Sequence, residues 1–346
     1  MKNIFLFCVA LFAAYVPGST IRSSEYEYLP QGARSDAMGG IGCASSRDAY
    51  CQFYNPALMA LSKNIQCNVE YTPIWNLGDD FTTGSAVLPL KNDLAFGIAY
   101  SRLEINGIPY FDELDGSSFQ DRKDNLAYRS TGRPLGSFST VYDLAGFSIA
   151  KWYRTTFSRE AFYKLTIPVC LSFGAKIKFY RQSFYFPSSL KQQDFEGHAS
   201  DMDGGMLLRF TIDRDLATGK ETKVFTAGYS IKNILKSNVA YNTDRKYEDS
   251  GERIRTLGFA YQQEITLLRG SIVAAVDLLK RWYETQTYRY GVEYGYKNLL
   301  FIRSGWCDGS WSAGAGFSYK WITVDYSFRQ HELSATPYRI GLGLTF

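Results

Sequence analysis

The sequence predicts an all-β fold, a transmembrane antiparallel up-and-down β-barrel of about 14 strands. From residue 63 onward, apolar side chains alternate with polar or small ones, which is the period of a strand with one apolar face. After the apolar segment 4–16, no run approaches the roughly 18 apolar residues that a membrane-spanning helix needs. Without such helices, a chain can cross a membrane only as a closed barrel, because lipid offers no partners for unpaired backbone groups.

The composition agrees with this fold. The chain has 346 residues, which suits one large closed barrel. Aromatic residues make up 16% of the chain and glycine occurs 30 times, a mixture typical of the aromatic girdles and turns of such barrels. The formal charge of +4 is small and scattered, so the composition indicates no nucleic-acid partner.

The chain divides into three predicted parts. Residues 1–19 read as a signal peptide, because a short charged start and the apolar segment 4–16 precede small residues that suit cleavage. Residues 20–62 are rich in glycine and small side chains and keep no period, which predicts a compact irregular segment. Residues 63–346 carry the alternating pattern and form the predicted barrel.

The alternating runs predict 14 strands in order along the barrel part of the chain. The strands are expected near residues 65–71, 81–89, 94–101, 139–151, 165–181, 203–212, 223–231, 254–264, 270–279, 288–296, 299–306, 311–319, 321–328 and 337–346.

The connections provide a second test of the barrel. Both ends of the chain should lie on the periplasmic side, so short turns should alternate with long loops. Short turns of one parity are expected at 90–93, 265–269, 297–298 and 319–320. Long polar stretches of the other parity lie at 103–138, 182–202 and 232–253. The stretches 152–164 and 213–222 do not fit this alternation, because they are longer than periplasmic turns.

The last strand carries the clearest pattern. Tyr338 and Phe346 lie on its apolar face, while glycine, threonine and arginine occupy the other face. Such a strand closes a barrel by pairing with the first strand, so we predict contact with outer-membrane lipid and a barrel assembly signal at Tyr338 and Phe346 for the barrel-assembly machinery. A soluble β-sandwich is the alternative fold, but it would show no parity of connections and would need no terminal phenylalanine.

Three short motifs stand close together in the irregular segment. They are GARSDAMGG at residues 32–40, the pair Asp48-Ala49, and Asn55-Pro56-Ala57. Together these motifs resemble the start of the FadL-type outer-membrane transporters of long-chain fatty acids, and equally the start of their PorV-type relatives. The resemblance implies that residues 20–62 are a hatch, a plug that carries an NPA motif inside a 14-strand barrel of a diderm bacterium's outer membrane.

The resemblance also implies a function. It implies passive uptake of hydrophobic small molecules past the hatch, with long-chain fatty acids as the leading substrate and without a cofactor. The implied hatch site comprises Asn55, Pro56, Ala57, Gly39 and Gly40. The PorV-type alternative is an outer-membrane scaffold or shuttle that binds a secreted or surface protein. A general porin fits less well, because a plugged lumen does not conduct freely.

The hatch motif has a physical interpretation of its own. Pro56 fixes its own φ and biases Asn55 away from helix, so that the Asn55 amide can cap or turn the chain. A helix start with no role in transport explains the same residues equally well. FadL-type transporters are thought to release substrate sideways at a kinked strand, and Gly97 lies in the third predicted strand. A single strand glycine more often accommodates close packing.

Charged side chains fall on the predicted inner face of the barrel. They are Lys176, Lys178, Arg209, Arg289, Glu293, Arg303, Asp325 and Arg339. The favoured interpretation is that these residues pair with one another across a filled lumen. Alternatively, Lys176, Lys178 and Arg209 contact the carboxylate headgroup of a substrate while aromatic residues of the outer loops take its chain.

The sequence gives no indication of catalysis or of a metal site. The only two histidines, His198 and His331, fall in predicted outward loops without a catalytic motif. Five cysteines follow the leader without a CxxC pair, so neither redox catalysis nor metal binding is indicated. Cys43 and Cys51 are either a disulfide or two small buried thiols.

Overall fold

The structure, a computed structural model, describes most of the chain after the predicted leader. The described residues are Glu27, 29–74, 79–111, 120, 125, 132–161, 163–187, 194–214, 221–242, 249–281, 286–330 and 338–346. In this part of the chain, no helix is long and apolar enough to span a membrane.

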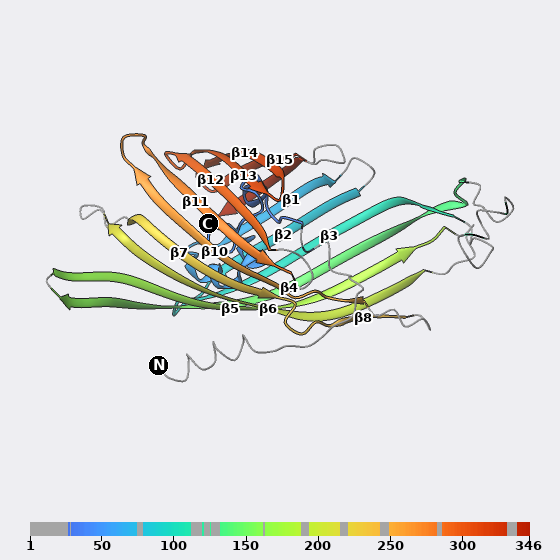
Figure 1. The fold of residues 1–346 in the computed structure, drawn as a ribbon, viewed down its shortest axis with the longest axis horizontal. Coiled ribbons are helices and arrows are strands. Elements are labelled where there is room, and N and C mark those ends of the chain that lie inside the picture. Colours follow the sequence, from blue (N-terminus) through green and yellow to red (C-terminus); the bar gives the residue numbers. More distant parts are fainter. Residues whose placement is uncertain are drawn as a thin grey trace.

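The strands form one closed antiparallel barrel of 14 strands, as the alternating pattern predicts (Figure 1). These strands are β1(Gln66–Ile74), β2(Asp79–Pro89), β3(Leu94–Tyr110), β4(Gly136–Ala161), β5(Tyr163–Tyr185), β6(Phe195–Arg214), β7(Glu221–Lys232), β10(Ile254–Ile265), β11(Gly270–Lys280), β12(Thr287–Tyr296), β13(Leu300–Cys307), β14(Ser310–Tyr319), β15(Ile322–Arg329) and β16(Tyr338–Thr345). Each strand pairs with the next, and β16 closes the barrel by pairing with β1. An additional short hairpin, β8(Asn238–Tyr241) and β9(Asp249–Ser250), pairs with the start of β6.

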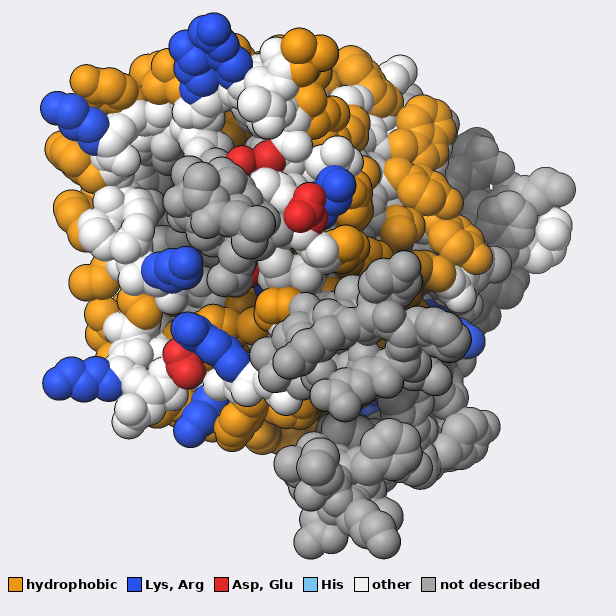
Figure 2. All heavy atoms as spheres, turned by 90° about the vertical axis from the view of Figure 1, so that its left-hand side faces the viewer, with side chains coloured by type: hydrophobic (Ala, Val, Ile, Leu, Met, Phe, Trp, Pro, Cys, Tyr) orange, Lys and Arg blue, Asp and Glu red, His pale blue; other side chains and the backbone are white. Residues whose placement is uncertain are grey.

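The two faces of the wall have different chemistry because successive side chains of a strand point to opposite sides. Large apolar side chains such as Ile98, Phe179 and Leu342 are exposed on the outer face. Figure 2 looks at the left-hand end of Figure 1 and shows such side chains around the circumference. In a barrel surrounded by lipid, this outer apolar band replaces the buried core of a soluble protein.

The two ends of the barrel differ in the length of their connections. The connections at 90–93, 266–269, 297–299 and 320–321 are tight and lie at one end, which we call the short-turn end. Asn92 and Asp93, and likewise Lys297 and Asn298, all have positive φ, as the two central residues of a type I′ turn require. The opposite end, with connections such as 111–135, is the long-loop end.

Two predicted connections at the short-turn end were wrong. The stretch 152–164 is not a loop, because β4 continues to Ala161 and pairs with Tyr163 at the start of β5. The stretch 213–222 is likewise shorter than predicted, since Arg214 at the end of β6 pairs with Glu221 at the start of β7. Both corrections restore the alternation of short turns and long loops.

The error has a physical cause. The pairing of β3 with β4 starts at Lys151, and the pairing of β5 with β6 starts at Val169. In the described structure, residues 156–168 therefore pair only with each other and extend beyond the rest of the wall, at the left of Figure 1. Outside the lipid, neither face of the strand pair needs apolar side chains. The alternating pattern therefore fades, although the hydrogen-bond ladder between β4 and β5 continues.

The closing strand ends on a contact with the first one. Phe346 donates its N–H to the Ile65 carbonyl at 2.9 Å and accepts the Ile65 N–H at 3.1 Å. The ring of Phe346 stacks on Trp321, with 6.1 Å between the ring centroids. These bonds seal the seam of the barrel, while the assembly signal at Tyr338 and Phe346 stays a prediction.

The extension of β4 and β5 predicts that its removal spares the barrel. Thr155 and Val169 are direct partners, so replacing residues 156–168 with Asn-Gly should join them by a two-residue turn. We expect the urea midpoint in detergent to be almost unchanged, because an isolated two-stranded ribbon adds little stability in water. Loss of the heat-modifiable folded band on a gel would contradict this placement.

Candidate functional site in the barrel lumen

The lumen is filled by the N-terminal segment 29–62, which we call the luminal segment. It contains three short helical pieces, α2(Ala33–Ala37), α3(Cys51–Tyr54) and the 3-10 helix η2(Pro56–Leu61). Nearly all of its side chains are buried, and Figure 1 shows it inside the barrel. A glycine-rich sequence suits this position, because the segment must turn several times within the lumen.

The motif Asn55-Pro56-Ala57 fixes the luminal segment to the wall. The Asn55 side-chain oxygen accepts the Ala57 N–H at 3.1 Å, which caps η2, and Pro56 is the first residue of that helix. The Asn55 side-chain amide donates to the Cys43 carbonyl at 2.9 Å and to the Met206 carbonyl of β6 at 3.0 Å. Asn55 is therefore a helix cap and also a link between two parts of the segment and the barrel.

Gly39 and Gly40 form the turn after α2. Both have positive φ, near 78°, a conformation that glycine adopts without strain. The Gly39 N–H donates to Ser312 of β14 at 3.0 Å, and the Gly40 carbonyl accepts from Arg289 of β12 at 2.8 Å. A Cβ on Gly39 would lie 2.8 Å from the backbone oxygens of β12 and β13, so the turn touches the wall directly.

Inward-facing glycines of the wall contact the luminal segment around most of the barrel. We call this set the glycine girdle: Gly97, Gly174, Gly205, Gly228, Gly258, Gly291, Gly305 and Gly314, on β3, β5, β6, β7, β10, β12, β13 and β14. A Cβ on Gly174 would collide with the backbone of Pro56 and Ala57, and one on Gly305 with the backbone of Met38 and Gly39. The girdle thus lets the two backbones approach each other more closely than any side chain would allow.

Ion pairs connect the α2 half of the luminal segment to the wall. Glu293 of β12 accepts two guanidinium groups, Arg34 of α2 at 2.8 Å and Arg303 of β13 at 2.7 Å. Arg303 also binds Asp325 of β15 at 2.6 Å. Asp36 accepts hydrogen bonds from Ser327 and Arg329, both at 2.9 Å.

Asp36 stays ionised in this buried position. Burial raises the pKa of Asp36, but the guanidinium groups of Arg329 and Arg339 outweigh burial and hold it below its usual range. Arg339 also binds Glu70 of β1 at 3.0 Å. The charges of α2 and the wall therefore neutralise one another pair by pair.

The predicted headgroup residues lie on the inner face, but their environments differ. Lys178 is fully buried and binds Glu27 at 2.8 Å and Asp203 at 2.7 Å. Lys176 lies over the ring of Phe53, 4.3 Å from its centroid, and makes no ion pair among the described residues. Arg209 binds Glu221. The other predicted inward charges also lie inside the barrel, so pairing across a filled lumen is the main feature, while headgroup binding stays a prediction.

Gly97 belongs to the girdle and not to an opening in the wall. It pairs with Val87 of β2 and with Ser148 of β4, in registers that run without interruption past this position. A Cβ on Gly97 would lie 2.5 Å from the Met59 sulfur. The sequence favoured close packing at Gly97 over a lateral exit for substrate. The structure supports close packing.

The described cysteines are free thiols, and the one described histidine is exposed. Cys43 and Cys51 are both free thiols, and burial raises the pKa of each thiol, which keeps them protonated. His198 lies exposed near Glu196, and His331 lies outside the described residues. Within the described part of the chain, no group of three His, Cys, Asp or Glu side chains is arranged to hold a metal ion.

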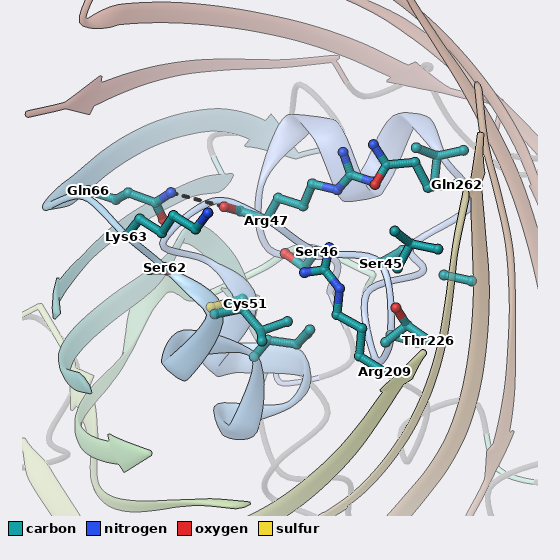
Figure 3. Close-up of a pocket in the computed structure, with 16 residues that line it drawn as sticks. Ser45, Ser46, Arg47, Cys51, Ser62, Lys63, Gln66, Arg209, Thr226 and Gln262 are labelled. Atoms are coloured by element: carbon teal, nitrogen blue, oxygen red, sulfur yellow. Dashed lines mark hydrogen bonds between the residues drawn. The ribbon is translucent and has the colours of Figure 1, made fainter. Parts of the chain in front are cut away.

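A cavity of about 250 Å³ lies between the luminal segment and the wall, toward the short-turn end (Figure 3). It is lined from the segment by residues such as Arg47 and Leu58, and from the wall by residues such as Arg209 and Gln262. A second cavity of about 540 Å³ shares Leu61, Lys63 and Arg209 with it and reaches Trp152 of β4. Sequence reasoning missed both cavities, because nothing in the alternating pattern marks the space between the luminal segment and the wall at the short-turn end.

No protein-family model matches the chain, and no curated protein matches its sequence. Among solved structures, it is similar to the toluene transporter TodX of Pseudomonas putida, with a TM-score of 0.52 at 13% identity over 94% of this chain and 99% of TodX. It is also similar to the toluene transporter TbuX of Ralstonia pickettii, with a TM-score of 0.50 at 13% identity over 93% and 100% of the two chains. The CymD monoaromatic hydrocarbon channel matches with a TM-score of 0.51 at 12% identity over 92% and 98%.

The closed barrel with an apolar outer face defines the class: an outer-membrane β-barrel of a diderm bacterium. Its fold is that of the FadL-family transporters, represented here by TodX, TbuX and CymD. The predicted resemblance is therefore confirmed for the fold. These neighbours are transporters and a channel, not enzymes.

The girdle predicts that an added methyl group will displace the luminal segment. In Gly205→Ala the new Cβ would collide with Asn55, so we expect the free energy of unfolding to fall by about 1–3 kcal/mol. Limited proteolysis should then cut within residues 29–62 faster than in the wild type. The matched control is Gly84→Ala on β2, where a Cβ would meet only the Asn68 carbonyl at 3.9 Å. Equal effects of the two substitutions would contradict a specific role of the girdle.

Proposed function

We propose that this protein lets hydrophobic small molecules diffuse passively across the outer membrane, and that the luminal segment is the hatch on their path. The observation that carries this proposal is the filling of the lumen by a segment that contacts the wall strand by strand through the glycine girdle. The proposed division of the chain follows: a signal peptide at 1–19, a hatch at 20–62 and the barrel at 63–346. Within the hatch, Asn55, Pro56, Ala57, Gly39 and Gly40 hold the closed position.

An aromatic cluster at the long-loop end supports a hydrophobic substrate. Its members are Tyr110, Phe138, Phe184, Phe186, Phe195 and Tyr241, from β3, β4, β5, β6, β8 and the residue after β5. Phe184 and Phe195 stack with their centroids 4.4 Å apart, and Phe138 and Phe186 with theirs 5.2 Å apart. Aromatic surfaces of this kind bind apolar molecules through dispersion and burial of apolar area.

The finer proposal concerns the substrate. TodX and TbuX are toluene transporters, and CymD is a monoaromatic hydrocarbon channel. For this chain we propose long-chain fatty acids as the leading substrate, with Lys176, Lys178 and Arg209 as candidate headgroup contacts. Among these three, Lys176 is the one that makes no ion pair with a carboxylate in the described part of the chain, whereas Lys178 and Arg209 already bind carboxylates.

A scaffold or shuttle for a secreted or surface protein is the second candidate. The observation that favours it is the height of the wall at the long-loop end. There β3, β4, β5 and β6 are longer than strands such as β13, and the β8–β9 hairpin pairs with the start of β6. Such a surface can hold a protein partner. A partner that co-purifies stoichiometrically, together with absent ligand binding, would favour this candidate.

A binding titration tests the proposed function directly. The folded protein is titrated with a fluorescent long-chain fatty acid beside a variant that lacks residues 20–60. We expect saturable binding that unlabelled fatty acid displaces and that the deletion alters, because the deletion removes the hatch and its contacts. Absence of saturable binding by the folded barrel would exclude the fatty-acid proposal, and an aromatic hydrocarbon would then be tested in its place.

A disulfide between the hatch and the wall should block transport. The Cys43 sulfur lies 3.7 Å from the Ser230 hydroxyl oxygen of β7, so the Ser230→Cys variant should form a disulfide with Cys43 on oxidation. We expect uptake of the fatty acid by cells or proteoliposomes to fall severalfold when oxidised and to recover with a reductant. The control combines Ser230→Cys with Cys43→Ser, which cannot form this bond. Undiminished uptake by the verified cross-linked protein would show that the hatch need not move at Cys43.

A further inference from the structure

The 250 Å³ cavity between the luminal segment and the wall combines cationic and apolar side chains. Lys63 follows η2, Arg47 precedes α3 and Arg209 projects inward from β6, so the three cations reach the cavity from three separate parts of the chain (Figure 3). Leu58 and Leu61 of η2 provide an apolar wall on one side of the cavity. The opposite wall is completed by the apolar residues Val224, Ala260 and Val273 of β7, β10 and β11.

Two of the three cations of this cavity, Arg47 and Lys63, are not balanced by a carboxylate among the described residues. No Asp or Glu is among the described residues that line the 250 Å³ cavity. Arg47 donates a hydrogen bond to the neutral Gln262 at 2.5 Å, and neither Arg47 nor Lys63 makes an ion pair within the described part of the chain. Arg209 binds Glu221, yet its Nε is buried and has no hydrogen-bond partner among the described groups.

Several arginines elsewhere in the lumen are instead paired with carboxylates. Arg34, Arg303 and Arg339 each bind a carboxylate at 3.0 Å or closer. Inside a barrel, where water is scarce, an unpaired cation is costly, so such pairing is the expected arrangement. At the cavity Arg47 and Lys63 remain exposed to solvent and keep their charges available to an anion from outside.

The position of the cavity matters as much as its charge. Two lining residues, Lys63 and Gln66, lie at the start of β1. Two others, Gln262 and Val273, lie close to the tight turn between β10 and β11, so the cavity is at the short-turn end. Short turns face the periplasm in outer-membrane barrels. A molecule that passed the hatch would therefore meet these cations last, just before it enters the periplasm.

We propose that this cavity is an exit site that binds the carboxylate of an amphiphilic substrate through Arg47, Lys63 and Arg209 while its apolar part lies against η2. This inference rests on the proposed uptake function and specifies its substrate class as an anionic amphiphile. An apolar cavity of about 150 Å³ is large enough for a benzene ring. The volume of about 250 Å³ therefore suits an aromatic carboxylate or a medium-length acyl chain, and longer chains would extend into the adjoining cavity.

The test compares two probes that differ only in the charged group. Octanoate and octan-1-ol are titrated by calorimetry into the full-length protein in nanodiscs of zwitterionic lipid. The variants are Arg47→Gln, Lys63→Gln and their double, and the matched control is Lys91→Gln, whose side chain is exposed in the turn after β2 and does not line the cavity. A folded barrel is confirmed for each variant by its heat-modifiable mobility on a gel.

We expect each single substitution to raise the Kd of octanoate by about 5- to 10-fold, and the double substitution to raise it further, because each removes a charge-assisted contact. The Kd of octan-1-ol should change by less than about 2-fold in every variant. Added salt should weaken octanoate binding and leave octan-1-ol unaffected, since ionic screening acts only on the charged probe. Lys91→Gln should match the wild type for both probes.

Three results would overturn the inference: unchanged octanoate binding in the double variant, equal losses for octanoate and octan-1-ol, or no octanoate binding by the wild type. Its failure can be distinguished from failure of the proposed function by an uptake assay with a neutral hydrocarbon such as toluene. Uptake of toluene together with any of the three results removes only the carboxylate site. Absence of uptake of both toluene and fatty acid removes the proposed function itself, and the exit site with it.

Discussion

Close contact between two backbones is the interaction on which the rest of this structure depends. A barrel of 14 strands has a lumen too wide for its own short side chains to fill, and an unfilled lumen would leave the outer membrane open. The glycine girdle lets the luminal segment lie directly against the wall, so that backbone groups such as the Gly39 N–H and the Ala57 carbonyl reach Ser312 and Ser172. Without the girdle, side chains would hold the segment away from these partners, and its buried polar groups would lose their hydrogen bonds.

The luminal segment is held differently in its two halves. Around α2, buried ion pairs from Arg34 and Asp36 to the wall fix the segment, and breaking one would leave an unpaired charge in a dry lumen. Around α3 and η2, the contacts are hydrogen bonds of neutral groups, such as Gln52 with Ser85 and Asn55 with Met206, together with apolar packing of Leu58 and Met59. The second half is therefore held by neutral hydrogen bonds and packing, and it is also the half that borders the cavities at the short-turn end.

The electrostatics of the lumen reconcile a polar interior with a proposed hydrophobic cargo. Most inward-facing charged side chains form ion pairs with one another. They are therefore part of the packed filling of the barrel and do not line an aqueous path. The apolar surfaces that a cargo needs lie at the two ends instead, as the aromatic cluster at the long-loop end and the wall of η2 at the short-turn end. A continuous path between them requires a rearrangement of the segment, and under the proposed function this requirement separates the protein from a general porin.

The sequence by itself determined the barrel, its strand order and the inward position of residues such as Lys178 and Glu293, because lipid imposes a strict period of two on every strand that crosses it. It also marked the motif Asn55-Pro56-Ala57 and the turn at Gly39 and Gly40, since Pro56 fixes its own φ and the two glycines permit positive φ. It could not place the ends of β4 and β5, where water on both faces removes the period. Only the tertiary structure decided that Gly97 packs against Met59, that Glu27 pairs with Lys178, and that Arg47, Lys63 and Arg209 line one cavity. These contacts join residues far apart in the chain, and their geometry depends on how the segment lies inside the closed barrel.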